Sequence, residues 1–175
     1  MVNLLKQTIE EQELIALKFK YHPDALFMYS IGVNDKFYFG VEEYDFELSG
    51  YQIRKTSDIE NFIIVDNYSS KINELEGLKE EIVYYPINLT SFETIFNYLK
   101  ETDQIISIER EYGDEDGFFL IGKIVKVTED EIWFKDFNIN GVWNEELNIV
   151  PFEIITTIRF NSKYINTWTK YIKWN

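Results

Sequence analysis

Residues 117–138 read GFFLIGKIVKVTEDEIWFKDFN, two runs of apolar and aromatic residues separated by Thr128-Glu129-Asp130. Such runs, bounded by short polar breaks, predict two β-strands at 117–127 and 131–137 that are joined by a tight turn. Gly122 lies inside the first strand, and a glycine in this position is typical of a sharp bend. The stretch therefore predicts a strongly bent antiparallel pair.

Signals on both sides extend this pair into a larger unit. Upstream, Ser91 is expected to be the N-cap of a short helix, since apolar Ile95, Phe96 and Leu99 follow at helical spacing. Downstream, Asn140-Gly141 predicts a hairpin turn, because both residues tolerate positive φ. Further strands are predicted at 104–112, 145–150 and 153–160, with Pro151 at a strand start, where its missing N–H costs little. Many short strands at this spacing indicate a small barrel.

The two halves of the chain share a pattern. Leu14, Ile15, Leu17 and Tyr21 recur at the same spacing as Ile105, Ile106, Ile108 and Tyr112. Farther along, 35–39 aligns with 130–134, with the offset changed as it would be if loops had changed length. Chance similarity of two acidic β-rich segments is the alternative to a duplication. We predict a mainly β (α+β) chain of two tandem five-stranded barrels, each preceded by a short α-helix, with units at residues 1–88 and 89–175.

A short helix followed by five strongly bent strands resembles the Sm/LSm fold, an SH3-like small barrel. Residues 119–127, with Gly122, are similar to the first half of the first Sm motif, and 131–138, with Asp136 and Asn138, are similar to its third strand. Weaker counterparts in the first half are 31–33 and 44–46, and 50–59 resembles uncharacterised bacterial Sm-like proteins. The second Sm motif survives only as Ile53-Arg54-Lys55, without its glycine, and 148–151 does not match it. The resemblance implies an RNA-contacting role for Asn138 and Arg54.

Composition excludes several classes of function. The 175 residues carry 17 Lys+Arg and 31 Asp+Glu, a formal net charge of −14, and contain no Cys. Without Cys there are no disulfides, thiolate nucleophiles or thiolate metal sites. The negative charge makes nucleic-acid binding unfavourable, because that affinity depends largely on Lys and Arg displacing counterions. Charges interrupt the N-terminal segment before a signal-peptide core could form, and no apolar run is long enough to span a bilayer, so a cytoplasmic protein without membrane association is expected.

No set of residues in the sequence supports catalysis. His22 is the only His, and Gly-x-Ser-x-Gly, Walker and Gly-x-Gly-x-x-Gly motifs are absent. We therefore expect no enzymatic activity, no cofactor and no metal site. Tyr164, Trp168 and Tyr171 form one stripe of a predicted helix, which favours packing on its own barrel over a docking surface.

The acidity of both halves favours binding to a basic protein. We expect an inhibitor or immunity-type protein that neutralises a partner such as a nuclease or toxin, since an acidic surface speeds encounter with a basic one. The alternative is a divergent Sm-like RNA-associated protein that uses Asn138 and Arg54. The acidic residues predicted to contact the partner are Glu42, Glu43, Asp45, Asp114, Glu115 and Asp116.

Overall fold

Polar side chains begin three of the helices. Ser91 caps α3 (Phe92–Glu101): its hydroxyl accepts the N–H of Thr94 at 3.1 Å, and the Thr94 hydroxyl accepts the N–H of Ser91 at 3.2 Å. The predicted cap is therefore confirmed. Asn67 makes the same reciprocal pair with Ser70 at the start of α2 (Tyr68–Leu75), and Ser162 caps α4 (Lys163–Tyr171).

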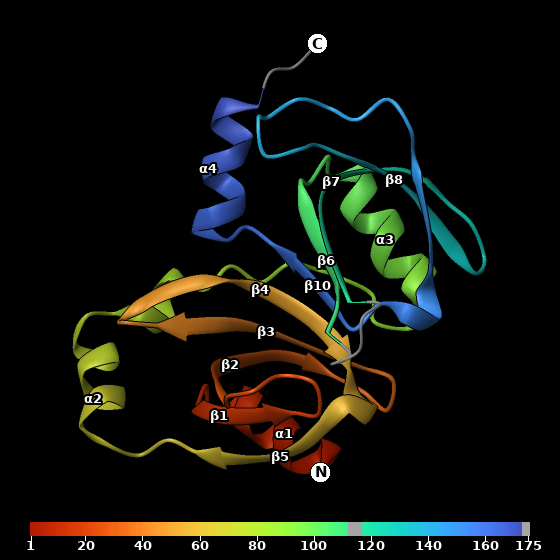
Figure 1. Cartoon of the computed structure of the whole chain (residues 1–175). Coiled ribbons are helices and arrows are strands. Elements are labelled where there is room, and N and C mark those ends of the chain that lie inside the picture. Colours follow the sequence, from red (N-terminus) through yellow and green to blue (C-terminus); the bar gives the residue numbers. More distant parts are fainter. Residues whose placement is uncertain (112–116, 173–175) are drawn as a thin grey trace. The chain divides into compact units, whose positions relative to one another are not determined.

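The computed structural model describes residues 1–111 and 117–172 and divides the chain into two compact units (Figure 1). The first unit is Met1–Leu89 and the second is Thr90–Asn175. The boundary therefore follows Leu89, one residue after the boundary at residue 88 that the sequence predicts.

The first unit begins with α1 (Val2–Glu10) and continues into five antiparallel strands in the order β5-β1-β2-β3-β4. A single 3₁₀ turn, Thr56–Asp58, separates the fourth strand from the fifth. The core of this unit includes Leu5 of α1, which is fully buried against strands β1 and β2. The strands are β1 (Leu14–Phe19), β2 (Leu26–Val33), β3 (Phe37–Tyr44), β4 (Glu47–Lys55) and β5 (Ile59–Ile64).

The second unit repeats this plan. After α3 its five antiparallel strands follow the order β10-β6-β7-β8-β9, and a 3₁₀ turn at Phe152–Ile154 again precedes the last strand. Helix α3 packs on β7, and its apolar residues Ile95, Phe96 and Leu99 are fully buried. The strands are β6 (Ile106–Arg110), β7 (Phe118–Val127), β8 (Glu131–Asp136), β9 (Asn148–Pro151) and β10 (Thr157–Phe160).

The shared order of elements agrees with the duplication predicted from the sequence. Each unit has a helix, four strands, a 3₁₀ turn, a fifth strand that returns beside the first, and a closing helix. The strand ladder is an open sheet, so the predicted closure of each unit into a barrel stays a prediction.

Gly122 is required by the close approach of β7 to β8. A Cβ atom there would lie 2.0 Å from the Lys135 carbonyl oxygen and 2.7 Å from the Asp136 Cα. Backbone atoms of a paired strand cannot move away without breaking the ladder, so only glycine fits. The sequence pattern located this glycine and its strand, and the pairing of Gly122 with Asp136 supplies the physical cause.

The end of the second unit differs from the sequence-based expectation. Strand β9 begins at Asn148, well after Asn140-Gly141, because the intervening residues form a longer connection with one isolated bridge between Phe137 and Trp143. Pro151 was expected to start a strand but ends β9, where it lies opposite Glu131. Proline is tolerated there because β9 is outermost in the order of this unit.

Candidate functional site

Asp136 at the end of β8 is the buried centre of the candidate site in the second unit. Its side chain is 9% exposed, and each carboxylate oxygen accepts a hydrogen bond from an asparagine side chain. Asn144 Nδ2 donates to one oxygen at 2.9 Å, and Asn148 Nδ2 donates to the other at 3.0 Å. Two neutral donors stabilise the buried carboxylate and hold the connection between β8 and β9 in place.

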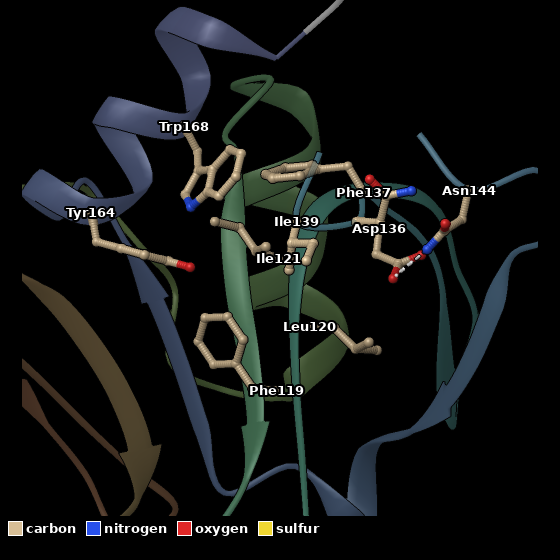
Figure 2. A pocket seen from close by; sticks show the side chains of 10 residues that line it. Phe119, Leu120, Ile121, Asp136, Phe137, Ile139, Asn144, Tyr164 and Trp168 are labelled. Carbon is tan, nitrogen blue, oxygen red and sulfur yellow. Dashed lines mark hydrogen bonds between the residues drawn. The ribbon is translucent and has the colours of Figure 1, made fainter. Parts of the chain in front are cut away.

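Aromatic side chains form a pocket of about 360 Å³ on one side of Asp136, which we call the aromatic pocket. Figure 2 shows Tyr164 and Trp168 projecting from α4 toward Phe119 and Ile121 of β7, with Asp136 and Asn144 at the opposite end. Phe119 is 49% exposed and Tyr164 is 54% exposed, and their ring centroids are 6.2 Å apart in an edge-to-face arrangement. The lining residues are Phe119, Leu120, Ile121, Asp136, Phe137, Asn138, Ile139, Asn144, Tyr164 and Trp168.

The position of α4 creates this pocket. Ile165 is buried, and Trp168 packs on Phe137 with ring centroids 5.4 Å apart. The sequence predicted one helical stripe of Tyr164, Trp168 and Tyr171, and the structure gives these side chains different environments. Trp168 contributes to packing, whereas Tyr164 and Tyr171 are largely exposed.

A second pocket, of about 430 Å³, adjoins the first, and we call it the acidic pocket. Both pockets are lined by Asp136 and Asn144, so these two residues form a shared wall. Beyond the wall, the exposed side chains of Glu145 and Glu146 line the acidic pocket. Because the Asp136 oxygens are already hydrogen-bonded, Glu145 and Glu146 are the carboxylates open to an incoming cation.

This arrangement suits the side chain of a lysine or an arginine. Such a side chain places an aliphatic stem along apolar surface while its charged head remains near polar groups. Aromatic faces attract the cation, and carboxylates beyond them supply the opposite charge. The sequence analysis did not single out Asn144, Glu145 or Glu146. These three polar residues follow the Asn140-Gly141 turn closely, and this position could have indicated an exposed acidic loop.

The acidic residues predicted in the first unit lie at the hairpin between β3 and β4. Glu42 accepts a hydrogen bond from Gln52 Nε2, and Glu43 Oε1 accepts the N–H of Phe46 at 2.9 Å. Glu43 is 9% exposed, so it shapes the turn, while Asp45 is exposed at its apex. Of the three predicted contacts in this unit, Asp45 is the one that is exposed.

The turn itself, residues 44–47, is held in an uncommon conformation, and we call it the hairpin tip. Asp45 has φ 51° and Phe46 has φ 65°, as both central residues of a primed two-residue hairpin require. Asparagine and glycine usually occupy these positions, and a bulky aromatic residue there is strained. Tyr44 is 65% exposed and Phe46 is 44% exposed, so the tip presents two aromatic rings around an aspartate.

The remaining predicted contact residues, Asp114, Glu115 and Asp116, lie outside the described residues.

The two residues implied by the RNA alternative have different environments. Arg54 on β4 is 3% exposed; its Nε donates to Gln52 Oε1 at 3.0 Å, and its guanidinium lies 4.4 Å from the centroid of the Phe19 ring. Asn138 is exposed, and its Oδ1 accepts N–H groups of Asn140 and Val142 at 2.9 and 3.3 Å. Each unit thus contributes one of the two residues.

Other classes of site are not found in the described part of the chain. Among residues 1–111 and 117–172, no group of three or more His, Asp or Glu side chains could hold a metal ion. The described helices are all too short or too polar to cross a membrane. Comparisons with protein-family models, with curated proteins and with solved structures find no match to this chain.

Proposed function

We propose that this chain is a non-enzymatic acidic binding protein whose partner is a basic protein, as expected for an inhibitor or an immunity-type protein. The observation that supports the proposal is the pair of adjoining pockets in the second unit, one aromatic and one acidic, with Asp136 and Asn144 as their common wall.

The two pockets provide both parts of the contact that a basic side chain needs. Basic side chains of the partner would lie against the rings of Tyr164 and Phe119 in the aromatic pocket, and would meet Glu145 or Glu146 in the acidic pocket. The formal charge of −14 adds long-range attraction that raises the association rate for a basic partner and falls as salt is added.

The hairpin tip is a second contact surface for the same kind of partner. Exposed aromatic rings anchor many protein interfaces, and Asp45 between them suits a basic neighbour. Strain that is retained at an exposed position is itself a signal of function.

The decisive experiment is a titration of the isotope-labelled protein with an Arg- and Lys-rich peptide, followed by NMR. We expect saturable shifts at the Trp168 indole and the Asn144 amide, and weaker binding at higher salt. The double substitution Glu145→Gln and Glu146→Gln should weaken binding by about threefold to tenfold, as the loss of two partly solvated ion pairs predicts.

The matched control is Glu129→Gln with Asp130→Asn, which removes the same charge from an exposed turn of the same unit. It should change affinity only through the small long-range term. Equal weakening by both double variants, or shifts confined to residues away from the two pockets, would contradict the proposed site.

RNA association is the second candidate function, and the aromatic pocket is the observation that favours it. Phe119 and Tyr164 offer exposed rings on which bases could stack, and Asn138 belongs to the lining of the same pocket. Gel-shift titration with single-stranded RNA at low salt tests this reading. A shift that Tyr164→Ser abolishes would favour RNA, whereas no shift at micromolar protein would remove this candidate.

We also propose that each unit is a divergent Sm-like barrel. The support is the strand order 5-1-2-3-4 within each unit, the preceding helix and the close approach of β7 to β8 at Gly122. An experimental structure in which the first and last strands of this order close on each other would support barrel closure, and flat separated edges would contradict it.

A further inference from the structure

A third pocket, of about 320 Å³, lies in the first unit, and we call it the polar pocket. None of its lining residues belongs to the hairpin tip. Four segments build it: the link between α1 and β1, which carries Glu11 and Glu13; strand β2, which carries Tyr29; the end of β5 and the residues after it, 64–66; and the region of α2 and the following turn. Strand pairing holds the first two together, because Leu14 of β1 lies opposite Tyr29 of β2.

Buried polar atoms at this pocket and beside it have no hydrogen-bond partner. Tyr29 lines the pocket and is 2% exposed, yet its hydroxyl is unpaired. Asn73 of α2 is 1% exposed and does not line the pocket; neither Oδ1 nor Nδ2 of its side chain has a hydrogen-bond partner of normal geometry, although its interaction with the Tyr29 side chain lowers the Tyr29 pKa against the larger effect of burial. Glu13 Oε2, also in the pocket lining, is buried and unpaired as well.

The unpaired Tyr29 and Glu13 oxygens at the polar pocket need an explanation. A buried polar group without a partner costs about 1–3 kcal/mol, and native proteins keep few of them. Departures from this rule are expected at functional sites, where a ligand supplies the missing bonds.

The charges around the pocket indicate the sign of that ligand. Four carboxylates and two ammonium groups line it, and Lys79 already donates to Glu74 at 2.9 Å. Burial raises the pKa of Glu13, the nearby charge of Glu11 raises it further, and Lys79 opposes the rise only in part. Burial likewise raises the pKa of Tyr29 to about 12, which keeps its hydroxyl protonated. The charged lining residues are Glu11, Glu13, Asp66, Lys71, Glu74 and Lys79.

We propose that the polar pocket is a binding site for a guanidinium group. A guanidinium carries five N–H donors in a fixed planar arrangement and is weakly hydrated, so it can bond Glu13 Oε2 and the Tyr29 oxygen, which both belong to residues that line the pocket. An ammonium ion is a compact, strongly hydrated charge that fits this spread of acceptors less well. The site stands independently of the pockets in the second unit, since its residues all belong to the first.

The guanidinium could be an arginine side chain of a protein or a free guanidino compound, and titrations of the full chain distinguish these sources. The probes are ethylguanidinium, a capped Gly-Gly-Arg-Gly-Gly peptide and its Lys counterpart, with NMR detection of the Asn73 side-chain amide. Both guanidinium probes should shift that amide saturably, and the Lys peptide should bind more weakly. Tighter binding of the peptide than of ethylguanidinium points to a protein source, and the reverse order points to a small molecule.

Two variants test the assigned residues. Tyr29→Phe and Glu13→Gln should each weaken ethylguanidinium binding by about tenfold, the typical effect of losing a hydrogen bond that involves a charged group. Tyr68→Phe is the matched control, because Tyr68 is 80% exposed at the start of α2 and removal of its hydroxyl should leave binding unchanged.

Thermal unfolding without ligand gives a second readout that does not depend on binding. Since the Tyr29 hydroxyl is unpaired in the folded state, Tyr29→Phe should keep or raise the melting temperature, by up to about 4 °C for each 1 kcal/mol gained. Two outcomes overturn the proposal: no saturable shift of the Asn73 amide with either guanidinium probe, or a crystal structure grown with ethylguanidinium that shows only water against Tyr29 and Glu13. Neither outcome affects the proposal of a basic partner, because that proposal is tested by NMR shifts of residues in the second unit.

Discussion

At Gly122 the backbone of β7 lies so close to β8 that a methyl group cannot be added without displacing main-chain atoms of Lys135 and Asp136. Single residues with this degree of constraint determine whether a unit keeps its fold. Asp58 is a contrasting case, in which burial of the charged group opposes folding: its carboxyl group is 9% exposed and its Oδ2 has no hydrogen-bond partner. Both positions yield quantitative predictions.

Gly122→Ala should destabilise the second unit by about 3 kcal/mol or more, because the new Cβ overlaps backbone atoms that cannot move independently. Urea unfolding measures the change. Gly32→Ala is the control, since its Cβ would meet a Leu89 methyl group at 3.1 Å, which can shift, and we expect a loss below about 1 kcal/mol. Equal stability of wild type and Gly122→Ala would show that the close approach is wrong.

Asp58 should make stability increase as the pH falls from neutral. Burial raises its folded-state pKa, and Lys55 and Lys20 offset this only partly. The folded protein therefore binds a proton at higher pH than the unfolded chain does, so the charged form of Asp58 reduces stability above the raised pKa. Asp58→Asn should be more stable than wild type at neutral pH, with the advantage shrinking toward about pH 4.

Denaturant unfolding across this pH range, with exposed Asp35→Asn as control, measures the effect of Asp58. The control matters because protonation of any carboxylate lowers the negative charge of the whole protein. If the stability gained by Asp58→Asn does not vary with pH, the proposed coupling between Asp58 protonation and folding is wrong.

At the scale of elements, the hairpin between β3 and β4 combines strain with exposure. A residue with φ near 60° and a Cβ atom costs roughly 1–2 kcal/mol relative to an ordinary conformation, and here both central residues of the hairpin tip are of this kind. The hydrogen bond from the Phe46 N–H to Glu43 helps to hold them.

Phe46→Gly should stabilise the first unit by about 1 kcal/mol, because glycine adopts positive φ without a steric penalty, while some of the gain is lost to the more flexible unfolded chain. Melting temperature measures the gain. Phe46→Ala keeps the strain and removes the ring, so it should not stabilise. If the tip contacts the partner, both variants should weaken binding to a basic peptide despite their different stabilities.

The whole molecule carries 31 acidic and 17 basic side chains, so like-charge repulsion opposes its compact state. Raising NaCl from about 0.01 M to about 0.1 M shortens the screening length from about 30 Å to about 10 Å. We expect the melting temperature to rise over this range, equally for NaCl and KCl. A difference between the two salts would indicate a specific ion site instead of screening.

Local signals in the sequence predicted much of the fold. Ser91 was identified as a cap from its position before a helical apolar pattern, and Gly122 and the strands around it were found from period and composition. The ends of the second unit were placed less well, because the Phe152–Ile154 turn and the long connection before β9 depend on contacts with other strands.

The candidate sites were less predictable. Acidity and aromatic content were visible in the composition, but Glu42 and Glu43 prove to have partners within the hairpin, which only strand pairing and turn geometry reveal. The sequence predicted the aromatic stripe on α4, which forms one side of the aromatic pocket. It did not predict that Phe119 of β7 lines the other side.

Sequence alone determined the mainly β character, the repeated order of elements, the Ser91 cap and the net charge, because these follow from propensities, spacing and residue counts. The polar pocket depended on the folded chain. Glu13 and Tyr29 are ordinary residues separated in sequence, and their polar atoms become buried and unpaired at the polar pocket only because the β1–β2 ladder and α2 enclose them. Burial and hydrogen bonding are properties of three-dimensional neighbours, which no local pattern records.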